Sequence, residues 1–261
     1  MRGVGKYSVW LGVFLLITLS LPAEVIFRES FDQGAGGWTT GKNKTHTQGE
    51  TWHRNILGYY GEPVFLKWSP SGGRSGGYAT AESPWYFDDN HGEFGWLYLV
   101  FGKRTGWSTY PVDEAAPTTG KDVRNATVRL SLRGRDMRLK GTRFYYWNQA
   151  PPAKGPWVYR CWALTSVPLE GYLTDGNWHD VSFTLDPHES KWSFMGLING
   201  GLRKRIRVIQ SLSFGQGTLE EVLGDGKLYN WGFILVDVDP LDPPSGKIDI
   251  DQFSITLSGE E

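Results

Sequence analysis

The chain has 261 residues, of which 34 are glycine, 14 are proline and 13 are tryptophan, and its formal net charge is −1 with histidine neutral. This near-neutral balance gives no overall attraction to nucleic acid or to an anionic membrane, so we expect no nucleic-acid partner. The single cysteine, Cys161, excludes an internal disulfide and a cysteine-based zinc site.

The first segment in chain order has the pattern of a secretory signal peptide. Arg2 and Lys6 precede an uncharged apolar run from Val9 to Leu21, and small residues end it at Ala23. The run is shorter than the about 20 residues that span a bilayer, although an uncleaved anchor is the alternative. We predict a signal peptide over 1–23 and a single β-sandwich domain over 24–261, placed outside the cell, in the periplasm or on the cell surface, with no membrane span after cleavage.

Short alternating runs separated by turn residues dominate the remaining 238 residues. In Ala126–Leu132, apolar Val128, Leu130 and Leu132 alternate with polar side chains, which is typical of a half-buried strand. Similar runs predict strands at Val25–Phe31, Val64–Trp68, Gly77–Thr80, Phe94–Phe101, Arg143–Asn148, Trp157–Thr165, Trp178–Leu185, Val208–Phe214, Trp231–Val236 and Lys247–Leu257.

One short helix is predicted at Thr218–Leu223, where Thr218 and Glu221 form a capping box and Gly224 supplies the stop. Strands without regularly interleaved helices indicate an all-β fold. The fold class is therefore an antiparallel β-sandwich of two sheets, a jelly roll, with one short helix.

Aromatic side chains are the first candidate for a binding site, because a sugar ring packs its C–H face on an indole or phenol while its hydroxyls pair with polar groups. In Arg143–Asn148, alternation places Arg143, Tyr145 and Trp147 on one face of the strand. We expect the twelve tryptophans after Ala23 to exceed what one core absorbs, although any single one is a core candidate. The predicted ligand-binding residues are Trp52, Tyr59, Tyr60, Trp85, Trp107, Arg143, Tyr145, Trp147, Trp157 and Trp162.

A cation is the second candidate, and it arises from the strand Ile248–Ile255. Counting by twos, Asp251 shares a face with Phe253 and Ile255, and a carboxylate that points toward a core is costly unless it is paired or metal-bound. Oxygen ligands without thiolates favour calcium. A bulge that turns Asp251 outward, or an arginine that pairs with it, is the open alternative.

Two segments carry a resemblance to a known family. Glu29–Gly34 followed by Gly37-Trp38, taken with Ile250–Ile255, resembles the first and last strands of galactose-binding-like jelly rolls, including family 4 and related carbohydrate-binding modules. The resemblance implies that the two terminal strands lie side by side. It also implies a structural calcium ion held by Asp251 with Glu29 or Ser30.

Two turns carry a weaker resemblance to extracellular sandwiches. Gly72–Tyr78 is similar to the Gly-Gly-x-x-Gly-Gly-Tyr turn of laminin-B-like domains, and Asp175–His179 is similar to a hairpin start in laminin-G-like and concanavalin-like sandwiches. Together these features predict an exported, non-catalytic protein that stacks a polysaccharide or oligosaccharide on exposed aromatics and contains a structural calcium ion.

Two alternatives from other classes stay open. A polysaccharide-degrading enzyme, either a glycoside hydrolase or a lyase, could draw on nearby acids or on histidines with tyrosines, but the E-x-D-x-x-E strand of laminarinase-like sandwich hydrolases is missing. The candidate groups are Asp88 with Asp89, Asp237 with Asp239, Asp249 with Asp251, His53, His91 and His179. A structural or adhesion protein of the cell envelope is the other alternative.

Charge patterning adds a hint about the ligand. The segment 124–143 carries seven basic residues against Asp136 alone, and a second basic run spans Arg203–Arg207. If the two runs lie together, they favour uronate-bearing or sulfated polysaccharide. The alternative is that both are solvated strand faces and turns.

Overall fold

The computed structural model describes residues 23–40, 65–91, 95–104, 121–150, 158–199, 218–224, 230–239 and 241–257. Several predictions fall outside these ranges: the predicted signal peptide apart from Ala23, the strand expected at Val208–Phe214, the basic run Arg203–Arg207 and the candidate residues Trp52, Tyr59, Tyr60, Trp107 and Trp157. Within them, the helices are too short or too polar to cross a membrane.

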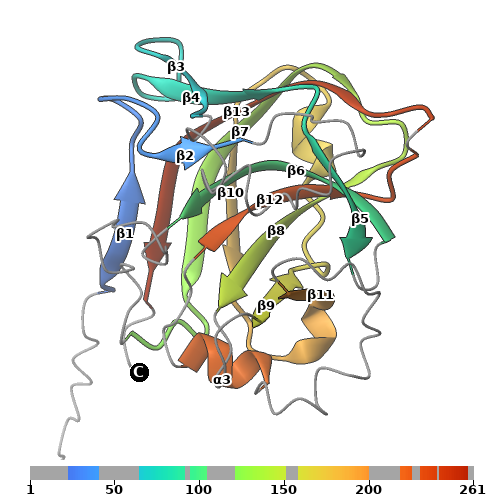
Figure 1. The fold of residues 1–261 in the computed structure, drawn as a ribbon. Coiled ribbons are helices and arrows are strands. Elements are labelled where there is room, and N and C mark those ends of the chain that lie inside the picture. The colour runs from blue at the N-terminus through green and yellow to red at the C-terminus, as the bar shows by residue number, and fades with distance from the viewer. Residues whose placement is uncertain are drawn as a thin grey trace, which may run out of the picture.

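Two antiparallel sheets make up the fold (Figure 1). The first, called sheet A, has the strand order β10, β7, β13, β4, β3, with β1 also paired to β13. Its strands span β1 (Val25–Glu29), β3 (Lys67–Ser69), β4 (Tyr78–Glu82), β7 (Thr127–Arg138), β10 (His179–Thr184) and β13 (Ser245–Thr256).

The second sheet, called sheet B, has the order β11, β9, β8, β12, β6, β2, with β5 paired to β6. Its strands span β2 (Trp38–Thr39), β5 (Tyr86–His91), β6 (Gly95–Arg104), β8 (Arg143–Ala150), β9 (Val158–Ala163), β11 (Ser193–Asn199) and β12 (Asn230–Val236). Short helices connect strands at η2 (Glu170–Leu173), η3 (Glu189–Lys191) and α3 (Leu219–Gly224). The predicted β-sandwich is confirmed, and the predicted helix begins and ends within one residue of α3.

The core lies between the two sheets and is rich in aromatic rings. Trp231 of sheet B stacks on Phe253 of sheet A with ring centroids 6.3 Å apart, and Tyr146 of sheet B meets Phe183 of sheet A at 5.2 Å. Trp38 contacts Phe253 edge to face at 5.0 Å. Such pairs add to the stabilisation that burial of the rings provides, so the core binds the two sheets together as one unit.

The terminal strands lie side by side, as the resemblance implies. β1 pairs with the second half of β13, from Glu29 opposite Phe253 to Val25 opposite Thr256. The first half of the same edge of β13 pairs with β4, where Lys247 lies opposite Glu82. In Figure 1, β1 and β13 run next to each other. The edge of β13 is therefore divided between two partners, and the change of partner falls near Asp251.

A bulge marks this change of partner. The pairing of β13 with β7 shifts register between Asp251 and Ser254, and Gln252 has a positive φ of 55°. The core keeps Ile250 and Phe253, whereas Asp251 turns to the other face. The count by twos, which placed Asp251 with Phe253, is wrong because the bulge inserts an extra residue, and the alternative of a bulge is confirmed.

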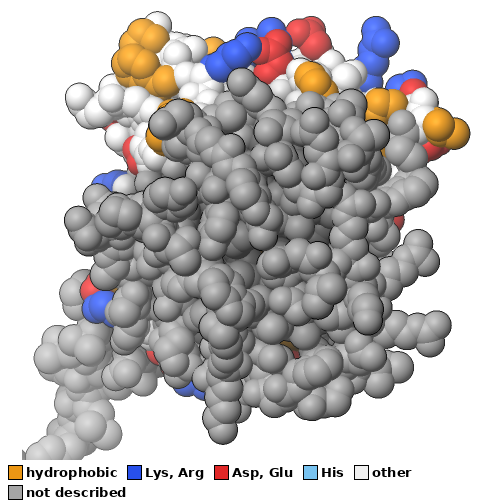
Figure 2. Space-filling model, viewed as in Figure 1, with side chains coloured by type: hydrophobic (Ala, Val, Ile, Leu, Met, Phe, Trp, Pro, Cys, Tyr) orange, Lys and Arg blue, Asp and Glu red, His pale blue; other side chains and the backbone are white. Residues whose placement is uncertain are grey.

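The end of the sandwich that carries β3 and β4 presents charged and hydrophobic side chains next to each other (Figure 2). Glu82 forms ion pairs with both Lys67 and Lys247 there. Phe65 and Trp68 are 54% and 41% exposed in the same region of the chain. Ion pairs as exposed as those of Glu82 contribute little to stability, and we regard this end as a solvated surface of the fold.

Candidate functional site

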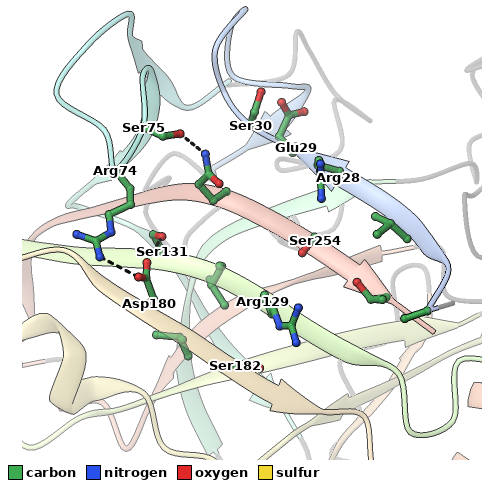
Figure 3. Close-up of a pocket in the computed structure, with 16 residues that line it drawn as sticks. Arg28, Glu29, Ser30, Arg74, Ser75, Arg129, Ser131, Asp180, Ser182 and Ser254 are labelled. Carbon is green, nitrogen blue, oxygen red and sulfur yellow. Dashed lines mark hydrogen bonds and ion pairs between the residues drawn. The ribbon is translucent and has the colours of Figure 1, made fainter. Parts of the chain in front are cut away.

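A groove of about 830 Å³ opens on the outer face of sheet A, across β1, β13, β7 and β10 (Figure 3). Twelve of its sixteen lining residues have polar side chains, while apolar atoms still make up about half of the exposed lining; the residues are Ala23, Val25, Arg28, Glu29, Ser30, Arg74, Ser75, Arg129, Leu130, Ser131, Asp180, Val181, Ser182, Gln252, Ser254 and Thr256. Hydroxyl, guanidinium, amide and carboxylate groups thus meet in one depression on a rigid sheet.

One row of side chains crosses the floor of the groove. Arg28 of β1 lies opposite Ser254 of β13, which lies opposite Arg129 of β7, which lies opposite Ser182 of β10. Residues directly opposite each other in an antiparallel ladder project to the same face, so the strand pairing itself places these four side chains together. Arg28, Arg129 and Ser182 are exposed.

The glycine-rich turn Gly72–Tyr78 forms one wall of the groove. The Gly73 amide donates to the Gly76 carbonyl at 2.9 Å, which closes the turn. The Asp251 carboxylate, which has no exposed surface, accepts from the Arg74 amide at 2.6 Å and from its own neighbour, the Gln252 amide, at 2.7 Å. Burial raises the pKa of Asp251, and these amide donors oppose the shift. The carboxylate therefore ties the turn to the bulge of β13.

Side chains complete this wall. Arg74 donates to Asp180 at 2.9 Å, Ser131 donates to the other oxygen of Asp180 at 2.7 Å, and Gln252 donates to the Ser75 hydroxyl. The hydrogen bonds from Ser131 and then Arg74 lower the pKa of Asp180 below its ordinary value. Figure 3 shows this chain of contacts at one end of the groove, while Arg28, Arg129 and Ser182 lie beyond it.

The lowered pKa of Asp180 gives a titration test. A carboxylate with a depressed pKa contributes stability above its unfolded pKa of about 3.9, and that contribution is lost as pH falls through the folded pKa. We expect the Asp180 carboxyl carbon to titrate by NMR below pH 3.9 and to move up toward that value in Arg74→Gln. An unchanged titration in Arg74→Gln would show that the ion pair in the wall does not form in solution.

A second cluster lies on the same face of sheet A, beyond the glycine-rich turn. The fully buried Asp249 carboxylate accepts from Arg133 at 2.8 Å and from Arg135 at 2.7 and 2.8 Å. Thr80 donates a further hydrogen bond to it at 2.7 Å. The carboxylate raises the pKa of Arg135, chiefly through the hydrogen bond. One carboxylate is thus shared by two guanidiniums, and the three charged groups of the cluster keep a net charge of about +1.

Trp178 joins this cluster to the turn. Its indole N–H donates to the Gly72 carbonyl at 3.1 Å, its ring meets Tyr78 edge to face at 5.7 Å, and the Arg133 guanidinium lies 4.4 Å from its ring centre. The two turn motifs of the sequence, Gly72–Tyr78 and Asp175–His179, are therefore in contact. This contact fixes the wall of the groove from its far side.

The structure distributes the predicted aromatic site residues differently from the sequence expectation. Trp85 is fully buried against Tyr98 and does not border a cleft from a loop. Trp147 and Trp162 are 2% and 7% exposed. Arg143 is exposed and pairs with Glu170. The alternation in β8 is as predicted, with Phe144 and Tyr146 in the core, but both faces of the strand are buried at its centre.

The exposure of the tryptophans can be compared with the expectation that one core does not absorb all twelve of them. Six tryptophans with described side chains are at most 7% exposed: Trp38, Trp85, Trp147, Trp162, Trp192 and Trp231. Trp68 is 41% exposed and Trp178 is partly exposed. Among the tryptophan side chains described, the exposed indole surface therefore lies on sheet A, beside the glycine-rich turn.

The predicted calcium ligands already have hydrogen-bond donors. Glu29 accepts from the Phe31 amide at 3.1 Å, Ser30 accepts from the Asp32 amide at 3.5 Å, and Asp251 accepts from three amides. In the described ranges, no three carboxylate, histidine or cysteine side chains are grouped as a metal site. Calcium at Glu29, Ser30 and Asp251 stays a prediction from the sequence, and the wall of the groove is held by hydrogen bonds.

The basic run 124–143 is not one surface. Arg133 and Arg135 pair with Asp249 in sheet A, whereas Arg143 lies in sheet B with Glu170. Arg124 pairs with Asp122 and Glu220, and Lys140 pairs with Asp242. Of the basic residues in this run, Arg129 and Arg138 have no ion pair among the described residues. Arg129 lies in the groove and Arg138 does not.

Comparison with known proteins does not identify a family for this chain. No protein-family model matches the chain, and no curated protein matches its sequence. One structural match is the family 11 carbohydrate-binding module from Clostridium thermocellum in complex with a beta-1,3-1,4-mixed-linked tetrasaccharide. It has a TM-score of 0.35 and 9% sequence identity, and the match covers 77% of this chain and 88% of that chain. The β-sandwich assignment follows from the strand pairing described above.

Proposed function

We propose that the protein binds a polysaccharide or an oligosaccharide, without cleaving it, in the groove on the outer face of sheet A. The observation that carries the proposal is the composition of the groove: hydroxyl, amide, guanidinium and carboxylate groups line one open depression of about 830 Å³. A sugar presents many hydroxyls, and each of them can both donate and accept a hydrogen bond. A groove with such polar groups therefore suits a sugar better than it suits an apolar ligand.

Rigidity of the site supports the same proposal. The floor comes from four paired strands, and the wall is fixed by the contacts of Asp251, Asp180 and Arg74. Groups held in place before binding lose little conformational entropy when the ligand arrives. Trp178 lies on the same face of sheet A as Ser182, so it adds a partly exposed ring beyond the wall, in keeping with the expected stacking.

The acids near the groove favour binding over hydrolysis. Among the described lining residues, Glu29 and Asp180 carry carboxylates, and they come from β1 and β10, with β13 and β7 between them. Three strand spacings put their backbones about 14 Å apart, and the Glu29 carboxylate is directed toward Gly36 and the Phe31 amide and not toward Asp180. The two acids are therefore not arranged as the carboxyl pair of a glycosidase, whose members lie roughly 5–9.5 Å apart. The predicted pair Asp249 and Asp251 is fully buried and hydrogen-bonded, so neither acid faces the groove as a free group.

Blocking the groove tests the proposal. We expect Ser182→Trp to fill the floor and to weaken polysaccharide binding at least about tenfold, or 1.4 kcal/mol, in affinity electrophoresis and on a glycan array. Thr184→Trp is the matched control, because Thr184 is exposed on the same strand but does not line the groove. Measuring glycan binding in calcium chloride and in EDTA distinguishes an effect of the substitution in the groove from an effect of the predicted calcium ion.

Two outcomes contradict the proposal. Equal loss of binding in Ser182→Trp and Thr184→Trp moves the site away from the groove. Absence of binding by the wild type to every glycan on neutral and acidic panels rejects carbohydrate binding.

A further inference from the structure

Two arginines in the groove differ from the paired arginines Arg133, Arg135 and Arg143. Arg133 and Arg135 share Asp249, and Arg143 pairs with Glu170. Arg28 and Arg129 are both exposed, and neither has an ion pair or a hydrogen bond from its side chain within the part of the chain that the structure describes. The groove therefore contains two guanidiniums whose charge no carboxylate of the described residues balances.

The two acids that line the groove form hydrogen bonds with groups other than Arg28 and Arg129. Asp180 is held by Arg74 and Ser131 at one end. Glu29 accepts from the Phe31 amide and is directed toward Gly36, where an added Cβ would lie 1.7 Å from its Oε2 atom. Neither carboxylate is bonded to Arg28 or Arg129, so the positive charge at the centre of the floor is available to a ligand.

The strand pairing sets the spacing of this charge. Arg28 and Arg129 lie opposite the same residue, Ser254, from the two strands that flank β13. Two strand spacings separate their backbones by about 10 Å, and hydroxyls of Ser254 and Ser182 lie in the same row. A guanidinium offers a planar fork of donors that matches a carboxylate or a sulfate, and adjacent hydroxyls extend the set of donors.

We infer that the groove recognises the anionic substituents of an acidic polysaccharide, and that Arg28 and Arg129 are the residues that bind them. This inference rests on the proposed function and names its ligand class. The shared chemistry is a carboxylate or a sulfate ester on a sugar ring. A hydrogen bond between groups of opposite charge is stronger at a partly desolvated surface than one between neutral groups. An acidic glycan can therefore form charged hydrogen bonds with both guanidiniums, whereas a neutral glycan of the same sugar backbone cannot.

Matched polymers test the inference. The probes are polygalacturonate with its methyl ester, and a sulfated galactan with its desulfated form, measured by isothermal titration calorimetry at low and high salt. We expect the acidic member of at least one pair to bind at least about tenfold more tightly than its neutral partner, with a dependence on salt. The pair that shows the difference identifies carboxylate or sulfate as the recognised group.

Variants locate the interaction. Arg28→Gln and Arg129→Gln remove the charge and keep a polar side chain, and each should weaken binding of the acidic polymer about tenfold while leaving the neutral polymer within twofold of wild type. Arg138→Gln is the control, because Arg138 is exposed on the same strand as Arg129 but outside the groove. Thermal unfolding of each variant confirms that the fold is intact, as expected for exposed side chains.

The outcomes separate the inference from the proposed function. Equal affinity for acidic and neutral polymers, or equal loss in Arg138→Gln and Arg129→Gln, overturns the inference and leaves carbohydrate binding in place. Binding of no polymer in either pair or on the neutral panel overturns the proposed function and, with it, this inference.

Discussion

Asp249→Ala is expected to be the most destabilising single substitution considered for sheet A. It leaves the Arg133 and Arg135 guanidiniums, whose side chains are 16% and 35% exposed, without the carboxylate that they share, so two positive charges face each other with no partner between them. Removing one partner of a buried ion pair typically costs about 3–5 kcal/mol, and partial exposure of the arginines places the expected loss near the lower limit. Urea unfolding measured by intrinsic tryptophan fluorescence gives the free energy of unfolding directly.

Asp242→Asn is the matched control for this experiment. Asp242 pairs with Lys140 at 3.0 Å, but the two side chains are 61% and 41% exposed. Water screens such a pair, so we expect a change of at most about 1 kcal/mol. If both substitutions destabilise the protein equally, the network around Asp249 is not a stabilising feature of the sheet.

Gly73→Ala is expected to have the second largest effect, since it acts on the wall of the groove. A Cβ at this position would lie 2.5 Å from the Gly77 carbonyl oxygen and 2.7 Å from an Asp251 carboxylate oxygen. Neither group can move without opening the turn or releasing the Arg74 amide from Asp251. Overpacking of this kind costs about 1–3 kcal/mol, and we expect thermal unfolding at lower temperature together with weaker glycan binding.

Gly171→Ala separates local crowding from the general effect of replacing a glycine. An added Cβ at Gly171 would meet nothing within 4 Å. We expect its melting temperature and glycan affinity to match the wild type. Wild-type values for Gly73→Ala as well would mean that the turn is not held as tightly against β13 as the hydrogen bonds indicate.

Alternation of polar and apolar residues carried most of the fold prediction. Ala126–Leu132 corresponds to part of β7, with Val128 and Leu130 in the core as expected. The three described strands that were not predicted lack that signal: β2 has two residues, β5 contains two aspartates and an asparagine, which are uncommon in strands, and β11 is largely apolar without a regular alternation. Local pattern therefore found the alternating strands and missed those that are short, polar or without alternation.

The site was less accessible to sequence reasoning than the fold. The polar face of Ala126–Leu132 already contained Arg129, but nothing local indicates that Arg28 and Ser182 share its row. That depends on the register between strands, which are 53 residues apart in sequence at Arg129 and Ser182 and more than a hundred apart at the two pairs with Ser254. Burial of Trp85 and Trp147 likewise depends on what packs over each ring, and residue type alone does not reveal it.

The shared edge of β13 has a consequence for how the chain reaches its fold. β4 and β1 have no direct pairing with β7 and are joined to it through residues 245–256, so they become part of sheet A only after β13 has been made. Until β13 is in place, the apolar faces of β1 and β4 are not held against β7 in one sheet and can associate with other chains. Assembly of the sheet is therefore expected to wait for β13 and to be slow, because its contacts join distant parts of the sequence.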